Sequence, residues 1–162
     1  MSNLKLFESL SRIQFPCEVS NGKAGFESIE QTVLFDTGSP NSMVTENLVK
    51  RLGLKPINNK RYRVKVSGVE ISLTPSVVIP MISFGEMVLK DVRVLVGLPD
   101  AEWQNTFLLG LNVLNFFAYK IDRSIGHGYI DITEGTRIAP KGTKRSRLNH
   151  LIMNGRFDIA PD

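Results

Sequence analysis

One carboxylate, Asp36, stands where a charge is costly. It directly follows the apolar run 33–35 (Val-Leu-Phe) and opens a segment of turn-forming residues, 36–42 (Asp-Thr-Gly-Ser-Pro-Asn-Ser). A carboxylate at the end of a buried strand is partly desolvated, which penalises its charged form. Such a group is a candidate for acid–base chemistry. The structural alternative is an Asx turn, in which the carboxylate accepts hydrogen bonds from nearby backbone N–H groups, and position alone favours this alternative.

A second segment of the chain has the same design. The apolar residues 107–109 (Phe-Leu-Leu) run into Gly110, just as residues 33–35 run into Asp36. At both places the pattern predicts a short buried strand that ends in a sharp turn and is followed by a short helix.

Other patterns that could carry chemistry are absent from the sequence or weak. No Gly-x-Ser-x-Gly segment marks Ser39 or Ser42 as a nucleophile. His127 and His150 lie at ligand spacing neither with each other nor with Cys17, the single cysteine, and no phosphate-binding glycine loop occurs. We therefore expect no metal site, no cofactor and no internal disulfide.

Length and composition indicate one globular domain. The 162 residues are 42% hydrophobic and 22% charged. No run approaches the roughly 18 consecutive apolar residues of a membrane-spanning helix, so no membrane partner is expected. Residues 1–10 lack the basic start and apolar stretch of a secretory signal, and Cys17 stands alone, so we expect a reducing, cytoplasmic setting.

The net charge of +4 is unevenly distributed along the chain. Six basic residues and no acidic one lie between Thr136 and Arg156, which leaves 14 basic and 16 acidic residues elsewhere. The high pI therefore belongs to residues 135–162, a basic C-terminal extension that we expect to be loosely packed and either solvated or self-associating. A nucleic-acid partner is not expected, because no aromatic residues interleave with the basic ones at 141–147.

The remaining sequence predicts short strands separated by turns. Leu4, Phe7 and Leu10, three apart, favour one or two helical turns in an N-terminal arm, residues 1–12. Strands are expected over 13–19, 32–35, 60–66, 69–73, 77–82, 88–96, 107–109, 118–121 and 129–132, and short helices over 46–52 and beyond a capping Asn112. Pro16 indicates an edge position for the first strand. The pattern predicts an all-β domain over residues 13–134, a small closed barrel.

Four features that occur in a fixed order along the chain carry a family resemblance. They are 35–39 (Phe-Asp-Thr-Gly-Ser), a short helix that ends at 52–54 (Leu-Gly-Leu), a glycine-tipped hairpin at Gly68, and 108–110 (Leu-Leu-Gly). Over residues 13–132 the sequence resembles the retropepsin-like aspartic proteases, the single-domain relatives of pepsin. The resemblance implies a closed small β-barrel with one short C-terminal helix, which acts as a symmetric homodimer, and the activity of an aspartic endopeptidase.

The resemblance also implies how the active site is built. Asp36 would be the catalytic residue and would meet its own copy across a two-fold axis, because the chain holds one Asp-Thr-Gly and a monomer would have half a site. The two Asp36 carboxylates would activate a water between them to hydrolyse a peptide bond.

The neighbouring residues would support this site. By the resemblance, Thr37 would brace the two loops across the dimer, Gly38 would admit the substrate backbone, and Ser39 would bond the outer carboxylate oxygen. Leu109 and Gly110 would form the second glycine turn.

The hairpin 60–73 corresponds in this resemblance to the flap that closes over substrate, with Ser67, Gly68 and Val69 at its tip. This tip departs from the glycine-rich flaps of many viral members, which leaves its substrate contacts open. The substrate would be a peptide or an unfolded protein, bound as an extra strand. The candidates for pocket walls, most of which we expect to be plain core residues, are Leu34, Val69, Ile71, Val77 and Ile79.

Two other functions stay open from the sequence. A catalytically inactive module of the same fold could serve as a dimeric peptide-binding scaffold, although the intact Asp-Thr-Gly segment argues against it. A nucleic-acid-associated protein could use the basic extension, and its binding to random DNA or RNA would then depend on salt.

Overall fold

The computed structural model describes residues 2–5, 7–9, 12–66, 69–84, 87–98, 107–122, 129–134, 144–145, 151–153 and 157–159. Its elements, in chain order, are β1 (Ser2–Lys5), β2 (Phe7–Ser9), β3 (Arg12–Ser20), β4 (Ile29–Phe35), β5 (Met43–Thr45), α1 (Glu46–Leu52), β6 (Tyr62–Val66), β7 (Val69–Thr74), β8 (Ser76–Phe84), β9 (Met87–Leu98), β10 (Phe107–Leu109), α2 (Leu111–Leu114), β11 (Phe117–Asp122), β12 (Tyr129–Glu134), β13 (Lys144–Arg145) and β14 (Leu151–Met153). Within the described ranges, no helix has the length and apolarity to cross a membrane.

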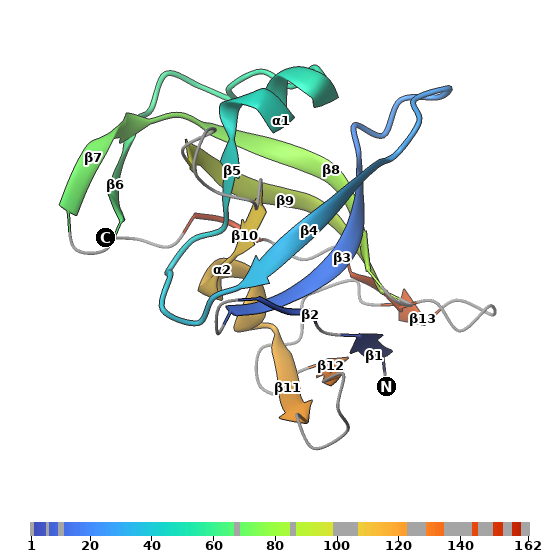
Figure 1. Cartoon of the computed structure of the whole chain (residues 1–162). Coiled ribbons are helices and arrows are strands. Elements are labelled where there is room, and N and C mark those ends of the chain that lie inside the picture. Colours follow the sequence, from blue (N-terminus) through green and yellow to red (C-terminus); the bar gives the residue numbers. More distant parts are fainter. Residues whose placement is uncertain are drawn as a thin grey trace.

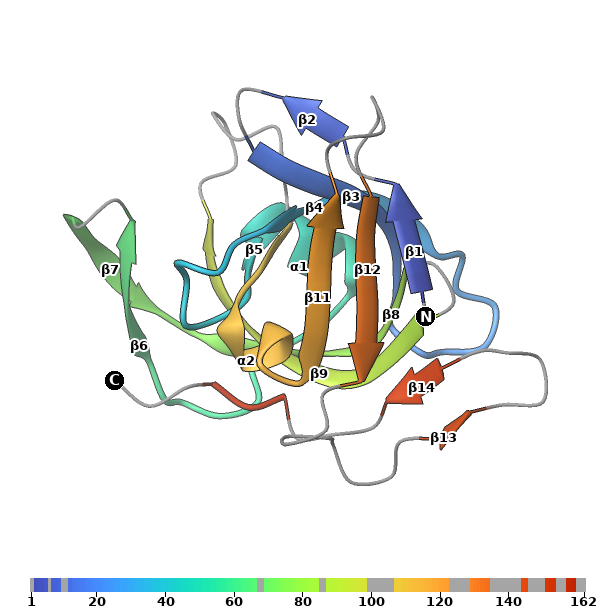
Figure 2. The ribbon, with the colours of Figure 1, turned by 90° about the horizontal axis from the view of Figure 1, so that it is seen from below.

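Six strands close into a small barrel (Figures 1 and 2). Around the barrel, β9 pairs with β5, β5 with β10, β10 with β4, β4 with β3, β3 with β8, and β8 again with β9. The β10–β4 and β5–β9 contacts are parallel, and the other four are antiparallel. The predicted all-β fold and its closed barrel are therefore confirmed.

The strands at the centre of the barrel divide their side chains between two apolar clusters. Val33 and Phe35 of β4 point into the main core, whereas Leu34 belongs to a second cluster. The same alternation in β10 places Leu108 in the second cluster, because successive strand residues face opposite sides of a sheet. Both clusters thus depend on the two short strands that lead into Asp36 and Gly110.

Helix α1 forms as the sequence predicts. The Thr45 side chain accepts a hydrogen bond from the backbone N–H of Leu48 at 3.2 Å, which caps the start of the helix. Gly53 ends it in the left-handed conformation, with φ of 65°. The helix turns its apolar side, including Leu48 and Leu52, into the main core.

The predicted helical turns in the N-terminal arm are wrong, because residues 2–5 and 7–9 form strands. β1 pairs with β12 and β2 pairs with β3, both antiparallel. Figure 2 shows β1, β12 and β11 side by side as a separate three-stranded sheet. A three-residue apolar spacing over ten residues is a weak helix signal, and hydrogen bonding to open strand edges outweighs it here.

The edge position that Pro16 implied is wrong for β3 as a whole but correct locally. β3 lies inside the sheet, between β4 on one side and β2 and β8 on the other. On that second side, β2 pairs with residues 12–14 and β8 with residues 18–20, so Pro16 lies between the two pairings. A proline has no N–H to donate, and it stands where β3 makes no ladder bond on that side.

The expectation of a loosely packed C-terminal extension is wrong at Phe157. This side chain is 1% exposed and belongs to the main core, and β14 pairs with the edge of β9. The basic residues Arg137, Lys141, Arg147 and Arg156 lie outside the described part of the chain.

Asp91 lies in β9 between two segments that pair with β8. Its φ of 55° lies in the left-handed region, and it falls between the pairs Met81↔Lys90 and Ile79↔Val92 of the β8–β9 ladder. Asparagine, aspartate and glycine tolerate this conformation better than other residues do.

We therefore predict different effects on stability for two substitutions of this exposed residue. Asp91→Gly should leave the free energy of unfolding within about 1 kcal/mol of wild type, whereas Asp91→Val should lower it by about 2 kcal/mol, because a β-branched side chain is strained at positive φ. Urea unfolding followed by circular dichroism measures both. Equal stabilities of the two variants would contradict the strained geometry.

Candidate active site

The register of two parallel strands brings Asp36 and Gly110 together. β4 and β10 pair with Leu109 beside Phe35, so the residues that follow leave the sheet at neighbouring points (Figure 1). The backbone N–H of Asp36 donates to the carbonyl of Leu109 at 3.0 Å, which extends the pairing by one residue. The two segments that the sequence singled out as similar are therefore adjacent in the fold.

The Asp36 carboxylate is half-buried and oriented by its own turn. Its Oδ1 accepts a hydrogen bond from the backbone N–H of Gly38 at 2.9 Å, and the Ser39 N–H approaches the Asp36 carbonyl at 3.4 Å. A Cβ atom on Gly38 would lie 3.2 Å from Oδ1, so the glycine lets the backbone close on the carboxylate. The Asx turn considered from the sequence is present, and it fixes the direction of the acid.

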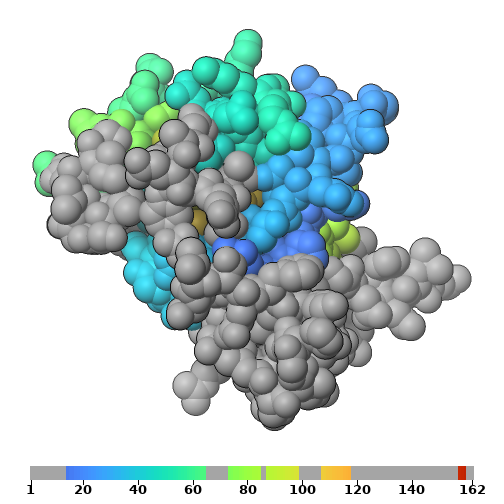
Figure 3. Space-filling view, viewed as in Figure 1, coloured from blue at the N-terminus to red at the C-terminus, as the bar shows by residue number. Residues whose placement is uncertain are grey.

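The residues around Asp36 differ in their exposure. Thr37 and Gly38 are exposed, and the 36–42 segment (light blue to cyan) reaches the surface in the space-filling view (Figure 3). Ser39 is half-buried, and its Oγ donates to the Asn41 carbonyl at 2.7 Å. In this single chain the one hydroxyl hydrogen of Ser39 is thus directed to Asn41 and not to the Asp36 carboxylate.

Gly110 is buried against the backbone of the 39–41 segment. A Cβ atom at this position would overlap the Asn41 carbonyl group and lie 2.8 Å from the Ser39 carbonyl oxygen. The following residues fasten the contact: the Leu111 N–H donates to Ser39 O at 2.8 Å and the Asn112 N–H to Pro40 O at 3.0 Å. The φ of Gly110 is an ordinary −108°, so close approach and not backbone conformation is the reason for a glycine here.

Ser42 and Asn112 form a buried polar network that the sequence analysis missed. Asn112 was expected to cap the second helix, but that helix begins after Gly110 without a side-chain cap. The Asn112 Oδ1 instead accepts from the N–H and the Oγ of Ser42, both at 2.7 Å, and its Nδ2 donates to the Arg93 carbonyl at 2.9 Å. The Ser42 Oγ in turn accepts from the Gly110 N–H at 3.0 Å. The available signal was an amide inside the apolar run 107–114.

The hairpin predicted over residues 60–73 is present as β6 and β7, a two-stranded sheet outside the barrel (Figure 1), and its role as a flap stays a prediction. Its Tyr62 and Val64 pack on the second cluster, with Leu34 and Leu108. Ser67 and Gly68, the expected tip, lie outside the described residues, as do the side chains of Val69 and Ile71. Val77 and Ile79 are fully buried in the main core, so the plain core interpretation is confirmed for these two.

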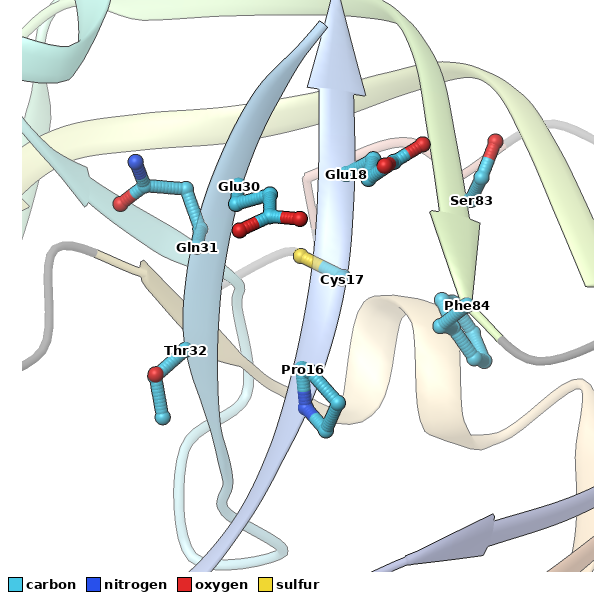
Figure 4. Close-up of a pocket in the computed structure, with 8 residues that line it drawn as sticks. All are labelled: Pro16, Cys17, Glu18, Glu30, Gln31, Thr32, Ser83 and Phe84. Carbon is cyan, nitrogen blue, oxygen red and sulfur yellow. The ribbon is translucent and has the colours of Figure 1, made fainter.

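An open cavity of about 540 Å³ lies away from the Asp36 turn, where β8 separates from β3. Figure 4 shows its lining, which comes from β3, β4 and β8: Pro16, Cys17, Glu18, Glu30, Gln31, Thr32, Ser83 and Phe84. Burial raises the pKa of the Cys17 thiol to about 12, and the nearby charge of Glu18 adds to this effect.

Among the described residues, no three His, Cys, Asp or Glu side chains gather to hold a metal, and His127 and His150 lie outside those residues.

Comparisons with known proteins agree with this geometry. The chain matches the aspartyl protease family over residues 16–113, a span that includes both Asp36 and Gly110. Among solved structures, it is similar to the crystal structure of a retropepsin-like aspartic protease from Rickettsia conorii, with a TM-score of 0.57 and 18% sequence identity. That similarity covers 79% of this chain and 88% of the other, and at this identity it shows the shared fold. No curated protein matches the chain.

The close approach at Gly110 predicts a specific loss of stability. Gly110→Ala should lower the free energy of unfolding by about 3 kcal/mol, because the added methyl group meets backbone carbonyls that cannot rotate away. Gly25→Ala is the control, since nothing lies within 4 Å of its Cβ position and only its φ of +79° opposes the change, at about 1 kcal/mol. Urea unfolding distinguishes the two, and equal losses would contradict the backbone contact.

The raised pKa of Cys17 predicts a pH-dependent reactivity. At pH 8 the folded thiol should react with iodoacetamide roughly a thousandfold more slowly than the unfolded thiol, because its pKa is about 12 instead of 9.0. Burial opposes ionisation of the thiol only in the folded state. The free energy of unfolding should therefore be undiminished below pH 9 and should fall between pH 9 and 12. Mass spectrometry of alkylated protein, with and without urea, measures the rates; similar rates would contradict the burial.

Proposed function

The chain belongs to the aspartyl protease family, and we propose that it is an endopeptidase in which two copies each contribute one Asp36 to a shared active site. The observation that carries the proposal is the placement of Asp36. It is a half-buried acid at the end of a core strand, oriented by its own turn, next to a glycine turn that packs on the same loop.

The exposure of the loop supports a shared site. Asp36 is the acid of the one Asp-Thr-Gly in the chain, and the Thr37 and Gly38 that follow it are exposed in the single chain. A two-fold axis beside this loop would place the second Asp36 opposite the first and would cover the exposed residues. Thr37 could then bind the partner loop, as the family resemblance implies.

The proposed chemistry follows from two carboxylates held close together. Both cannot ionise at short separation, so the pair holds one proton between its members. The charged member takes a proton from a bound water, and the protonated member polarises the carbonyl of the peptide bond. Water attack gives a tetrahedral diol. One carboxyl group then donates its proton to the leaving nitrogen while the other carboxylate takes a proton from a diol hydroxyl, the C–N bond breaks, and no covalent enzyme intermediate forms.

The β6–β7 hairpin is the proposed cover of the site. It stands outside the barrel, and Tyr62 and Val64 pack it onto the second cluster beside Leu34 and Leu108, the residues two positions before Asp36 and Gly110. An extended peptide or unfolded segment between the hairpin and the Asp36 turn would be shielded from water. Its main chain could pair as an added strand.

The proposal is tested by Asp36→Asn. The amide keeps an oxygen to accept the Gly38 N–H, so the loop should fold, but cleavage of a peptide library should fall by about 10³-fold or more because the shared proton is lost. Asp91→Asn, the same change at an exposed site on β9, should leave cleavage unchanged. Turnover retained by Asp36→Asn would refute the assignment, and peptide binding by a wild type that never cleaves would indicate the scaffold alternative.

Mixing the two proteins examines whether the site is shared. When Asp36→Asn is added in about tenfold excess and the subunits exchange, activity per wild-type subunit should fall to about a tenth, because most wild-type chains then face an inactive partner. Added Asp91→Asn should cause no such loss. Activity that is indifferent to the inactive variant would show that one chain works alone.

A further inference from the structure

The edge of β9 that faces away from β8 connects the buried Phe157 to the Asp36 loop. β8 covers one edge of β9 from Met87 to Leu95. On the other edge, β14 pairs at residues 87–89, Phe157 follows beside Val92, and β5 pairs at residues 95–98. Backbone groups at a sheet edge need partners when they are buried, and these segments supply them in turn.

Arg93 is the residue of β9 that hydrogen-bonds both to Phe157 and to Asn112. Its backbone N–H donates to the Phe157 carbonyl at 3.0 Å, and its own carbonyl accepts from the Asn112 Nδ2 at 2.9 Å. Two residues on, the Leu95 N–H donates to the Ser42 carbonyl at 2.9 Å. One residue of β9 is therefore held by Phe157 through its N–H and by the network behind the Asp36 loop through its carbonyl.

Phe157 also contacts the segment that carries Asn112. The centroid of its ring lies 5.0 Å from that of the Phe116 ring in an edge-to-face arrangement, and Phe116 lies two residues beyond α2. Phe157 thus contacts β9, whose Arg93 carbonyl accepts from the Asn112 amide, and the residues that follow the helix carrying Asn112. The neighbouring Ile159 packs on the second cluster together with Tyr62 of the hairpin.

We propose that Phe157 is a positioning residue for the Asp36 site, acting through Arg93 and Asn112 on Ser42 and Gly110. The catalytic consequence rests on the proposed proteolytic function, whereas the positioning of the network does not. The segment lies beyond residues 16–113, the span that matches the family. The nearby ion pair of Arg93 and Asp158, at 3.8 Å with Asp158 59% exposed, contributes little to this coupling.

The experiment compares Phe157→Ala with Phe84→Ala in the full chain. Both remove a buried phenyl ring from the main core, but Phe84 packs against Phe15, which in turn packs on Phe35, and none of these three belongs to the hydrogen-bond network of Ser42, Gly110, Asn112 and Arg93. Hydrogen exchange followed by NMR should show the Ser42 and Gly110 amides exchanging about tenfold faster, relative to the β8 amides, in Phe157→Ala and not in Phe84→Ala. In peptide cleavage, kcat should fall about tenfold with KM nearly unchanged, because Phe157 acts on the loop and not on bound peptide.

The outcomes separate this inference from the proposed function. Faster exchange spread evenly over the barrel in both variants would show that Phe157 only fills space and would overturn the proposal, as would a local change in exchange without loss of kcat. If wild type cleaves nothing, the exchange data still decide whether Phe157 holds the network. If the alanine variants do not fold, Phe157→Leu and Phe84→Leu replace them, and Asp158→Asn should match wild type throughout.

Discussion

Gly110 and the carbonyl groups of residues 39–41 are in backbone contact, and the geometry of the Asp36 loop depends on that contact. A loop of turn-forming residues has few apolar side chains with which to fix itself. Here the loop is held by the end of the neighbouring strand β10. Gly110, which has no side chain, packs against the loop backbone, and the Leu111 and Asn112 N–H groups donate to the loop carbonyls. The acid is thereby held by main-chain hydrogen bonds, whose geometry is less adaptable than that of side chains.

The polar network behind the loop supports the same contact from within the barrel. Ser42 and Asn112 are buried, and burying two such side chains would be costly if their hydrogen bonds were unmade. The bonds among Ser42, Asn112, Gly110 and Arg93 satisfy them and join three separate segments, the 36–42 loop, residues 110–112 and β9. A network of this kind favours a single arrangement of the loop, because alternatives leave a donor or acceptor unpaired.

The elements that could be predicted from the sequence are those that depend on residues close to one another in the chain. The helix over 46–52 that ends at Gly53, the strand within 60–66 and the turn at Asp36 all follow from the residues involved. The strand β1 and the burial of Phe157 could not be predicted, because they depend on edges supplied by β12 and β9, which are distant in sequence. Asn112 was assigned to the wrong role for the same reason, since its partners lie 70 and 19 residues away.

The position of β10 has a consequence for the order in which the molecule is made. Residues 107–109 form β10, the strand between β4 and β5, so a chain synthesised only as far as β9 has a gap in its barrel wall. β4 and β5, the strands on either side of that gap, are synthesised long before β10 leaves the ribosome. Long-range pairings of this kind form late in folding. The Asp36 loop therefore cannot form its contact with Gly110 during most of translation. Until β10 is made, the Asp36 carboxylate lacks the backbone contacts that fix its orientation in the finished fold.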